Sequence, residues 1–317
     1  MIEDLDTRHL RKRYIVRGRL VLETALHVGT GRAVSPLTDS PILRDAAGRP
    51  LIPGSSMKGA FRATVERIAP NLPGYWSCAL DDDVANCLSP QRSPLGDAYR
   101  AVRAYLGRAI PSQPVADDED AKLAHDALEK LGHPEWTDKN IGEEDLLRLL
   151  DEHLCDTCKL FGSPYLASKV HFQDLPVRTN EWLEVTEIRD GVGIDRDSER
   201  AVEQIKFDFE VVPSETAFDF GLVVENPTER DLGLLAVGLS ECTNGMVRLG
   251  GIRSRGLGAC RLKLDDVQVL DFSDHRALVV YLKEGALTTR PWAGFLTECI
   301  QNALEGLGGS DAQATGQ

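Results

Sequence analysis

The sequence predicts an α+β fold, and three patterns support this prediction. First, residues 14–29 and 206–212 alternate apolar and polar side chains with a period of two, which is typical of half-buried strands. Second, Phe61, Val65 and Ile68 recur at helical spacing after a turn. Third, the signals along the chain follow the order strand, helix, strands, helix, strand. This order fits a ferredoxin-like or RNA-recognition-motif-like sheet with helices on one face.

The remaining elements are expected from local signals along the chain. Residues 41–53 predict two short strands around a turn, and Ser55 or Ser56 is expected to cap the helix that follows. Residues 69–112 are broken by prolines, an acidic run and polar loops, so we expect mainly loops there. Further helices are expected at residues 120–132, 142–154, 228–243 and 291–306. Further strands are expected at 169–178 and at the end of residues 249–264, where a glycine-rich loop runs into a strand.

The length and composition indicate a globular protein with more than one unit. A chain of 317 residues is long for one compact domain, so we expect a core with a sizeable insertion. No apolar run approaches the roughly 20 residues that a membrane span needs, and the acidic start MIEDLDTRHLRKRY does not resemble a secretory signal. Seven cysteines with one CxxC pair favour a reducing cytosol over a disulfide scaffold. We therefore expect a cytoplasmic protein that has no membrane partner.

Charge is distributed unevenly along the chain. The net charge of −14 argues at first against a nucleic-acid partner. Residues 8–67, however, carry 12 Lys and Arg against 4 acidic residues, whereas residues 71–160 carry 9 against 18. This asymmetry favours a basic face that binds a polyanion and a separate acidic lobe, although a solvated charged surface is the simpler alternative.

The cysteines predict a structural zinc site that fastens the two ends of residues 69–158 together. Four thiolates make a closed tetrahedral zinc site, and the expected ligands are the CxxC pair with the two cysteines at the start of the region, Cys78, Cys87, Cys155 and Cys158. His153 or His133 remains an alternative for one ligand. The region shows little apolar pattern, so a bound metal would help it to fold.

Asp39 is the first candidate catalytic residue. It lies in a glycine-punctuated loop just before Ser40 and Pro41. A carboxylate in a loop suits metal binding or proton abstraction, although an aspartate there can equally cap a turn. Lys58 and Arg62 follow near the start of an amphipathic helix, where free backbone N–H groups and basic side chains suit phosphate binding.

The segment LGGIRSRGLGAC at residues 249–260 carries Arg253 and Arg255 between glycines. Glycine lets the backbone approach a phosphate closely and the arginines can clamp it, although a structural turn fits equally well. Neither a strand–GxGxxG–helix order nor the GxxxxGK[ST] spacing is present, which argues against a dinucleotide site and an ATPase. His27, at a strand end beside the Asp39 loop, is either a satisfied half-buried residue or an RNA contact.

Six motifs in a fixed order resemble those of one protein family. They are ALHVGTG (25–31), TDSPI (38–42), IPGSSMKGAFR (52–62), KLFGSP (159–164), GIDRDSERAVEQIKFDFEVV (193–212) and GGIRSRGLGAC (250–260). The chain is therefore similar to the repeat-associated (RAMP) proteins that form the backbone of type III CRISPR effector complexes. The resemblance covers roughly residues 14–68 and 155–270.

This resemblance implies a subunit with an RNA-recognition-like palm that polymerises with copies of itself and with other subunits along a CRISPR guide RNA, in antiviral defence. Asp39 resembles the family's aspartate that cleaves complementary target RNA, with Mg²⁺ or Mn²⁺ as the expected cofactor. Residues 189–205 resemble the hairpin thumb of the family, with Arg196 near its tip. RNA contacts are expected from basic and polar side chains of the matched motifs, His27, Ser55, Ser56, Lys58, Arg62, Arg196, Arg253 and Arg255.

The expected organisation has three parts. Residues 8–68 and 159–283 form the core, residues 69–158 form an inserted, acidic, zinc-stapled and partly helical lobe, and residues 284–317 form a C-terminal helix and a disordered tail. Two alternatives to a target-cleaving nuclease stay open. One is a non-catalytic subunit that only binds guide RNA, and the other is a ribonuclease that processes the guide.

Overall fold

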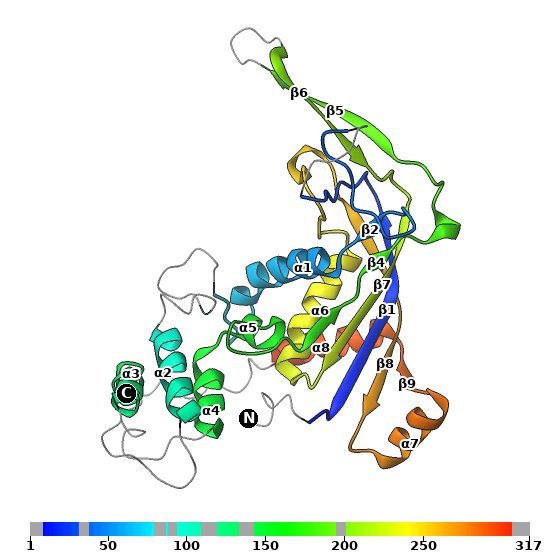
Figure 1. Cartoon of the computed structure of the whole chain (residues 1–317). Coiled ribbons are helices and arrows are strands. Elements are labelled where there is room, and N and C mark those ends of the chain that lie inside the picture. Colours follow the sequence, from blue (N-terminus) through cyan, green and yellow to red (C-terminus); the bar gives the residue numbers. More distant parts are fainter. Residues whose placement is uncertain are drawn as a thin grey trace.

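The computed structural model of the protein describes residues 9–31, 38–78, 87, 94–108, 119–132, 143–194 and 201–305. A strongly twisted sheet, helices on one of its faces, a projecting hairpin and a separate group of helices make up these residues (Figure 1). Their mixture of helix and strand confirms the α+β class. Within the described ranges, no helix combines the length and the apolar character that crossing a bilayer requires.

The main sheet has five strands, which lie in the order β3-β7-β1-β8-β9. Their bounds are Lys12–Leu22 for β1, Val170–Phe172 for β3, Ala217–Glu225 for β7, Cys260–Asp271 for β8 and Thr288–Arg290 for β9. Every neighbouring pair is antiparallel. Alternate residues of β1, from Tyr14 to Leu22, are buried, as the period-two pattern of its sequence predicts.

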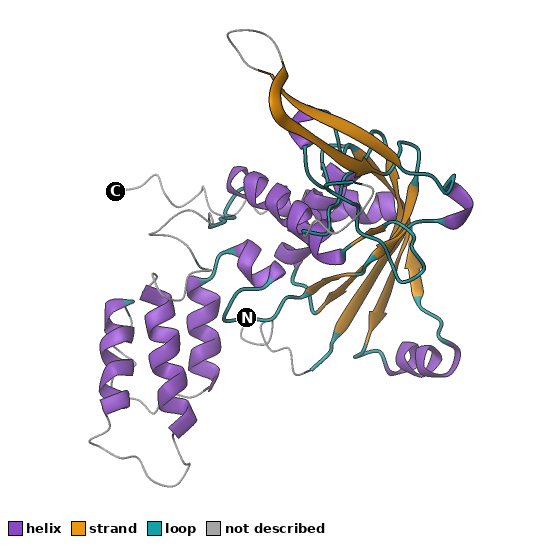
Figure 2. Ribbon diagram, turned by 45° about the horizontal axis from the view of Figure 1, so that its top comes forward, coloured by secondary structure: helices purple, strands orange, loops and turns teal. Residues whose placement is uncertain are grey.

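Three helices cover one face of this sheet, namely α1 (Gly54–Ile68), α6 (Glu229–Thr243) and α8 (Trp292–Glu305) (Figure 2). The order β1–α1–β3, then β7–α6–β8, is a β-α-β-β-α-β arrangement. Phe61 of α1, Leu239 of α6 and Phe295 of α8 share one buried core with the strands. The expected C-terminal helix is therefore present as α8, and it packs into the main core. Helix α7 (His275–Glu284), just before it, was not predicted.

The start of α1 differs from the prediction that Ser55 or Ser56 caps it. The helix begins at Gly54, the preceding Pro53 is extended, and Pro53 provides no side-chain cap. The N–H of Gly54 donates instead to Oδ1 of Asp174 at 2.8 Å. The prediction was wrong because the helix starts before both serines, and a carboxylate distant in sequence takes the place of a local cap.

A two-stranded hairpin projects from one end of the sheet (Figure 1). Its strands are β5 (Glu187–Ile194) and β6 (Ala201–Val211), and the second contains most of the alternating segment that the sequence marked as a strand. Arg196, predicted near the hairpin tip, lies outside the described residues. A smaller pair, β2 (Leu51–Ile52) with β4 (Leu175–Pro176), leads into α1.

The inserted region folds around its own small core. Helices α2 (Pro94–Arg108), α3 (Glu119–Lys130) and α4 (Glu143–His153) lie side by side away from the sheet, and α5 (Asp156–Phe161) leads back to it (Figure 2). Helices α3 and α4 confirm two predictions, whereas α2 was missed because prolines and polar residues surround its start. The expectation of little apolar pattern was wrong, since the helices bury a shared apolar cluster that includes Val102, Leu128 and Leu149.

Candidate functional site

His27 is the point at which three candidate segments meet. Its ring Nδ1 lies 2.7 Å from the carbonyl oxygen of Glu210, and its Nε2 lies 3.3 Å from Oγ of Ser40. A carbonyl only accepts hydrogen bonds, so Nδ1 carries the proton and Nε2 accepts from the Ser40 hydroxyl. The carbonyl of His27 also accepts the N–H of Gly251 at 2.9 Å. The residue therefore links the Asp39 loop, the hairpin and the glycine-rich loop, and neither ring nitrogen is left for the predicted RNA contact.

Asp39 is exposed at the base of the hairpin. Its backbone N–H donates to Oδ1 of Asp208 at 2.8 Å, and the N–H of Asp208 donates to Oδ2 of Asp39 at 3.3 Å. The next residue, Ser40, pairs in parallel with Phe209. These contacts hold the Asp39 carboxylate against β6 while leaving the side chain open to solvent.

Glu210 anchors the Asp39 loop to the hairpin. Its carboxylate accepts the N–H of Ile42 at 3.0 Å, the hydroxyl of Thr186 at 2.6 Å and Nη2 of Arg44 at 2.5 Å. Partial burial on its own would raise the pKa of Glu210, but the hydrogen bonds from Thr186, Ile42 and Arg44 outweigh it and hold this pKa below its ordinary value. The anchor is therefore ionised across the neutral range.

The two basic residues predicted on α1 have different surroundings. Nζ of Lys58 donates to Oγ of Ser168 at 2.8 Å. Burial, and then the nearby charge of Arg62, lower the pKa of Lys58. Arg62 is held within the protein, because its guanidinium donates to Glu66 at 2.7 Å and to the carbonyl of Gly162 at 3.0 Å. An RNA contact by Arg62 would have to compete with these partners.

Four further residues predicted to bind RNA lie in the first turn of α1 and in the glycine-rich loop. Ser55 is exposed and Ser56 is half-buried in the first turn of α1. Arg253 and Arg255 are exposed in a short 3-10 turn that begins after Ile252.

The glycine-rich loop that carries the two arginines is a tightly built turn. A Cβ on Gly258 would lie 1.9 Å from the carbonyl oxygen of Leu249, and one on Gly250 would lie 2.2 Å from that of His27. Both glycines also have positive φ angles, so larger residues are excluded on two grounds. The sequence left open whether this loop is a phosphate-binding loop or a structural turn. The structure shows a structural turn that presents two exposed arginines.

The four predicted cysteines meet at the junction of the lobe and the core. Cys78, Cys87, Cys155 and Cys158 are buried, and their sulfur atoms lie within 4.8 Å of one another. The Sγ atoms of Cys78 and Cys158 are 3.6 Å apart. A tetrahedral ion with metal–sulfur bonds of about 2.3 Å separates its ligand atoms by about 3.8 Å. The cluster can therefore hold a metal ion, and its four candidate ligand atoms are all sulfur.

The surroundings of Cys155 favour its thiolate form, whereas those of Cys87 and Cys158 raise the pKa of these two thiols. Interactions with the other sulfurs, first of all that of Cys158, lower the pKa of Cys155 below its ordinary value. Its Sγ also accepts the backbone N–H of Cys158 at 3.4 Å. Nη2 of Arg62 lies 3.4 Å from Sγ of Cys158, so a positive charge adjoins the cluster. A group of four thiolates around a divalent ion carries excess negative charge, and this guanidinium offsets part of it.

Sequence reasoning missed two residues that build the site, Asp208 and Glu210. Both contact the Asp39 loop across 168 or more residues of chain. The alternation of the segment 206–212 put the two carboxylates on one face of a strand. The alternation alone did not show which loop these two carboxylates contact.

Comparisons with known proteins identify the family of the chain. A family model described as the RAMP superfamily matches residues 19–261. The chain belongs to this superfamily. The match includes the end of β1, the Asp39 loop, α1, the inserted lobe, the hairpin and the glycine-rich loop, so the segments that build the candidate site fall within the matched region.

Two curated relatives share a shorter stretch with this RAMP protein. A protein named CRISPR system Cms endoribonuclease Csm3 from Methanocaldococcus jannaschii is 47% identical over 60 residues, which is 18% of this chain and 24% of the relative. A protein of the same name from Methanothermobacter thermautotrophicus is 41% identical over 59 residues, with the same coverage of both chains. The chain thus spans about a quarter of the length of these relatives.

Proposed function

We propose that this RAMP protein is a guide-RNA-binding backbone subunit of a type III CRISPR complex, in which it cleaves complementary target RNA at regular intervals. Membership of the RAMP superfamily and the names of the two relatives support this proposal. The observation that carries it is the exposed carboxylate of Asp39, which is fixed at the base of a projecting hairpin. In such a complex, copies of this chain and other subunits would line up along the guide.

The parts of the fold suit separate roles in this proposal. The five-stranded sheet with α1, α6 and α8 would act as the palm, and the β5–β6 hairpin would act as a thumb that enters the guide–target duplex. Because base pairing between guide and target reads the sequence, the protein needs only contacts to the sugar–phosphate backbone. The helical lobe, with its excess of acidic residues, would face a neighbouring protein or solvent.

Cleavage by a single carboxylate is chemically reasonable because RNA carries its own nucleophile. If the hairpin displaces one target nucleotide, the 2′-hydroxyl of that nucleotide can align with the adjacent phosphate. Asp39 would accept the 2′-hydroxyl proton as the oxygen attacks phosphorus and the 5′-oxygen leaves. The products would be a 2′,3′-cyclic phosphate and a 5′-hydroxyl.

Asp39 is also the residue that would hold Mg²⁺ or Mn²⁺ for this reaction. Such an ion supplies positive charge that stabilises the phosphate in the transition state. In the described part of the chain, the cysteine cluster is the one group of three or more side chains arranged to bind a metal. Asp39 would therefore share the ion with phosphate oxygens of the RNA.

We assign zinc to the cysteine cluster on the basis of its chemistry. Four sulfur ligands in a closed, buried arrangement are typical of structural zinc. The site sits between α5 and the chain that leaves the core after Tyr75, and it adjoins the small core of the lobe. Zinc bound there would fasten both ends of the lobe to the palm.

One observation favours the non-catalytic alternative. The carboxylate of Asp39 accepts the backbone N–H of Asp208, which is also what a residue that merely fixes a turn would do. Guide processing by a histidine has less support, because both ring nitrogens of His27 are already engaged.

The test is target cleavage by the reconstituted complex, containing guide RNA, Mg²⁺ or Mn²⁺ and a labelled complementary RNA. Asp39→Asn keeps the acceptor oxygen for Asp208 but removes the charge. We expect it to lower the cleavage rate by about 100-fold or more, with guide binding and thermal stability unchanged. Asp265→Asn, which alters an exposed aspartate on β8, is the matched control and should cut like the wild type. Regularly spaced cuts by Asp39→Asn at the wild-type rate would show that Asp39 is not the catalytic residue. Guide binding by the wild-type complex without any cuts would make the chain a scaffold.

A further inference from the structure

Six large apolar side chains are exposed within two short segments of the chain. One segment is the turn that leads into β5, and the other is α7. The side chains are Leu183, Val185 and Ile188 in the first segment, and Val279, Val280 and Leu282 in the second. Leu183 is 85% exposed and Leu282 is 72% exposed. Single exposed apolar residues are ordinary, but clusters of them are typical of surfaces that a partner covers.

Helix α7 has the sequence of a buried helix without its surroundings. Residues 277–282 are all apolar, so apolar side chains lie on every side of the helix. The carboxylate of Asp274 caps its start by accepting the N–H of Arg276 at 2.9 Å, and Gly285 ends it in a left-handed conformation. None of the residues of α7 is buried. Because an isolated helix of this length is marginal in water, a partner on its outer side would stabilise it.

The turn before β5 holds its leucine in a fixed, protruding position. Glu184 has a φ of 59°, in the left-handed region that residues other than glycine seldom adopt. Trp182 closes the turn, since its Nε1 donates to the carbonyl of Val185 at 3.2 Å and its side chain packs against the main core. Leu183 lies between these residues. Backbone strain is found preferentially at binding sites, and a rigid turn loses little entropy when a partner covers it.

The two segments carry opposite charges. Residues 181–188 contain three glutamates and no basic residue. Helix α7 carries Arg276 and Lys283 against one acid, Glu284. The two basic residues lie one helical turn before and one helical turn after the exposed valines, so they share a side of the helix with them. An apolar contact between the turn and this side of α7 would therefore be bordered by opposite charges.

The turn and α7 lie towards opposite ends of the main sheet (Figure 1). Glu181, beside the turn, pairs with Arg19 near the end of β1 at 3.1 Å. Helix α7 instead follows Asp271, which pairs with Lys12 at the start of β1. A contact between the two segments must therefore join two copies of the chain. Because the two surfaces differ, such a contact leaves one of each unoccupied at the ends of a dimer.

We propose that the turn at residues 182–185, together with Ile188, docks on the exposed side of α7 of a second copy of this chain. The contact forms in the absence of RNA and, because it is heterologous, it continues into an open chain of copies. The inference is independent of the proposed function, in which a guide RNA lines the copies up. It also uses a part of the molecule outside the family match, since α7 (His275–Glu284) lies beyond residues 19–261.

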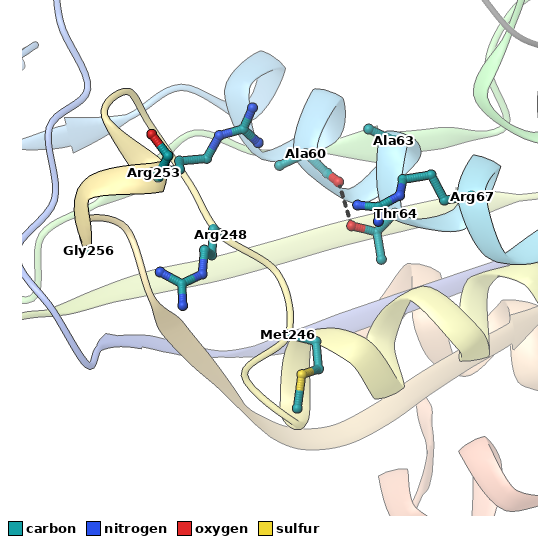
Figure 3. Close-up of a pocket in the computed structure, with 9 residues that line it drawn as sticks. Ala60, Ala63, Thr64, Arg67, Met246, Arg248, Arg253 and Gly256 are labelled. Carbon is teal, nitrogen blue, oxygen red and sulfur yellow. Dashed lines mark hydrogen bonds between the residues drawn. The ribbon is translucent and has the colours of Figure 1, made fainter.

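The contact uses none of the residues predicted to bind RNA. Arg253, one of those residues, lines a pocket between α1 and the segment that follows α6, together with Arg67 and Arg248 (Figure 3). Neither α7 nor the turn before β5 contributes a residue to the lining of this pocket. Self-association and RNA binding can therefore be measured separately.

The test is sedimentation equilibrium of the full chain, freed of nucleic acid, over a range of protein concentrations. The average mass of the wild type should rise with concentration beyond that of a dimer. Leu183→Ser and Leu282→Ser should each raise the dissociation constant by about tenfold or more, because each removes a leucine that the contact buries. Leu123→Ser, which alters a leucine of α3 that is 54% exposed, is the matched control and should associate like the wild type.

Charge reversal then tests whether the two segments are partners of each other. Glu184→Lys and Lys283→Glu should each associate more weakly than the wild type. An equimolar mixture of the two variants should associate like the wild type again, because every contact in it pairs opposite charges. Glu215→Lys and Lys130→Glu are the controls. Glu215 is likewise exposed with a φ of 63°, and Lys130 likewise lies in the last turn of a helix.

Three outcomes would overturn the inference. They are a wild-type chain that is monomeric at every concentration, a mass that stops at the dimer, and a mixture of the charge variants that associates no better than either variant alone. Thermal melting of each variant checks that its fold is intact. None of these outcomes bears on target cleavage, so the failure of this inference and the failure of the proposed function are distinguishable.

Discussion

The palm and the inserted lobe of this RAMP protein are stabilised in different ways. The palm buries large side chains from β1, β3, β7 and β8 and from three helices in one continuous core, with Phe61, Phe218 and Phe295 fully enclosed. The lobe has a smaller core, and four of its buried residues are the clustered cysteines. Small units that bury little apolar surface commonly depend on a metal. From this comparison we expect the palm to fold by apolar burial alone, and the lobe to depend on a metal ion bound by the cysteines.

Polar contacts at their boundary connect the two regions. Asp156, in the first turn of α5, accepts Nε of Arg230 at 3.0 Å and the backbone N–H of Trp76 at 2.9 Å. Arg62 joins Glu66 of α1 to the sulfur of Cys158. The proposed metal site therefore contacts α1, the helix that is proposed to bind RNA. Loss of the metal would alter the surroundings of Arg62 in this helix.

The largest effect is expected from removing a metal ligand. Cys78→Ser should release zinc and unfold the lobe, because structural zinc in small domains contributes an apparent free energy of roughly 10–16 kcal/mol. Metal analysis and hydrogen exchange of α2 to α4 measure this. Cys242→Ser is the control, since Cys242 is equally buried but lies in the palm core. The contradicting result is a wild-type protein that contains no metal, together with lobe helices that stay protected from exchange in Cys78→Ser. The lobe would then be stabilised in the same way as the palm.

The next effect concerns a charge buried in the palm. Nζ of Lys169 and Oδ2 of Asp231 are 2.6 Å apart, and both side chains are almost fully buried. Asp231 also forms the capping box of α6 with Thr228. Asp231→Ala should lower the free energy of unfolding of the palm by about 3–5 kcal/mol, because Lys169 would keep an uncompensated buried charge.

Chemical denaturation measures this loss, and a surface pair in the same sheet provides the control. Glu225→Ala breaks the ion pair with Arg13, which is partly exposed, and should cost less than about 1 kcal/mol. Equal losses for the two variants would show that burial does not govern the stability of the palm.

The sequence predicted the parts of this comparison that depend on local spacing. The CxxC pair, the apolar stripe of α1 and the alternation of β6 are each patterns within a short stretch of sequence. What it did not reveal depends on distant contacts. Arg62 and Arg67 look alike in the sequence, yet only Arg62 has an acid partner and a neighbouring sulfur in the fold. The role of Glu210 likewise arises only when the hairpin meets the Asp39 loop.

A smaller effect is expected at the loop that carries Asp39. Glu210→Gln keeps the shape of the side chain but weakens its bonds to Arg44, Thr186 and Ile42. Target cleavage should fall by about tenfold because Asp39 is less well positioned, while guide affinity stays the same. The single-turnover cleavage rate and the guide dissociation constant separate these effects. Glu187→Gln, on the exposed side of the hairpin, is the control. A parallel loss of guide binding would indicate general damage to the palm.

The smallest effect is a pH dependence. Burial lowers the pKa of Lys58, so its ammonium group loses a proton at lower pH than an exposed lysine does. RNA affinity should therefore weaken by about threefold as the pH rises from 8 towards 10, whereas Lys58→Arg should abolish this dependence because arginine stays charged. Binding of alkali-stable 2′-O-methyl RNA measures it. An equal pH dependence in both proteins would place the titrating group elsewhere.

The central claim is that the palm binds RNA and the lobe does not. Hydrogen exchange of the full chain, with and without single-stranded RNA, tests it most directly. We predict added protection in α1, in residues 246–258 and in the described part of the hairpin, with no change in α2, α3 and α4. Protection concentrated in the lobe helices, with α1 and the glycine-rich loop unaffected, would contradict the account.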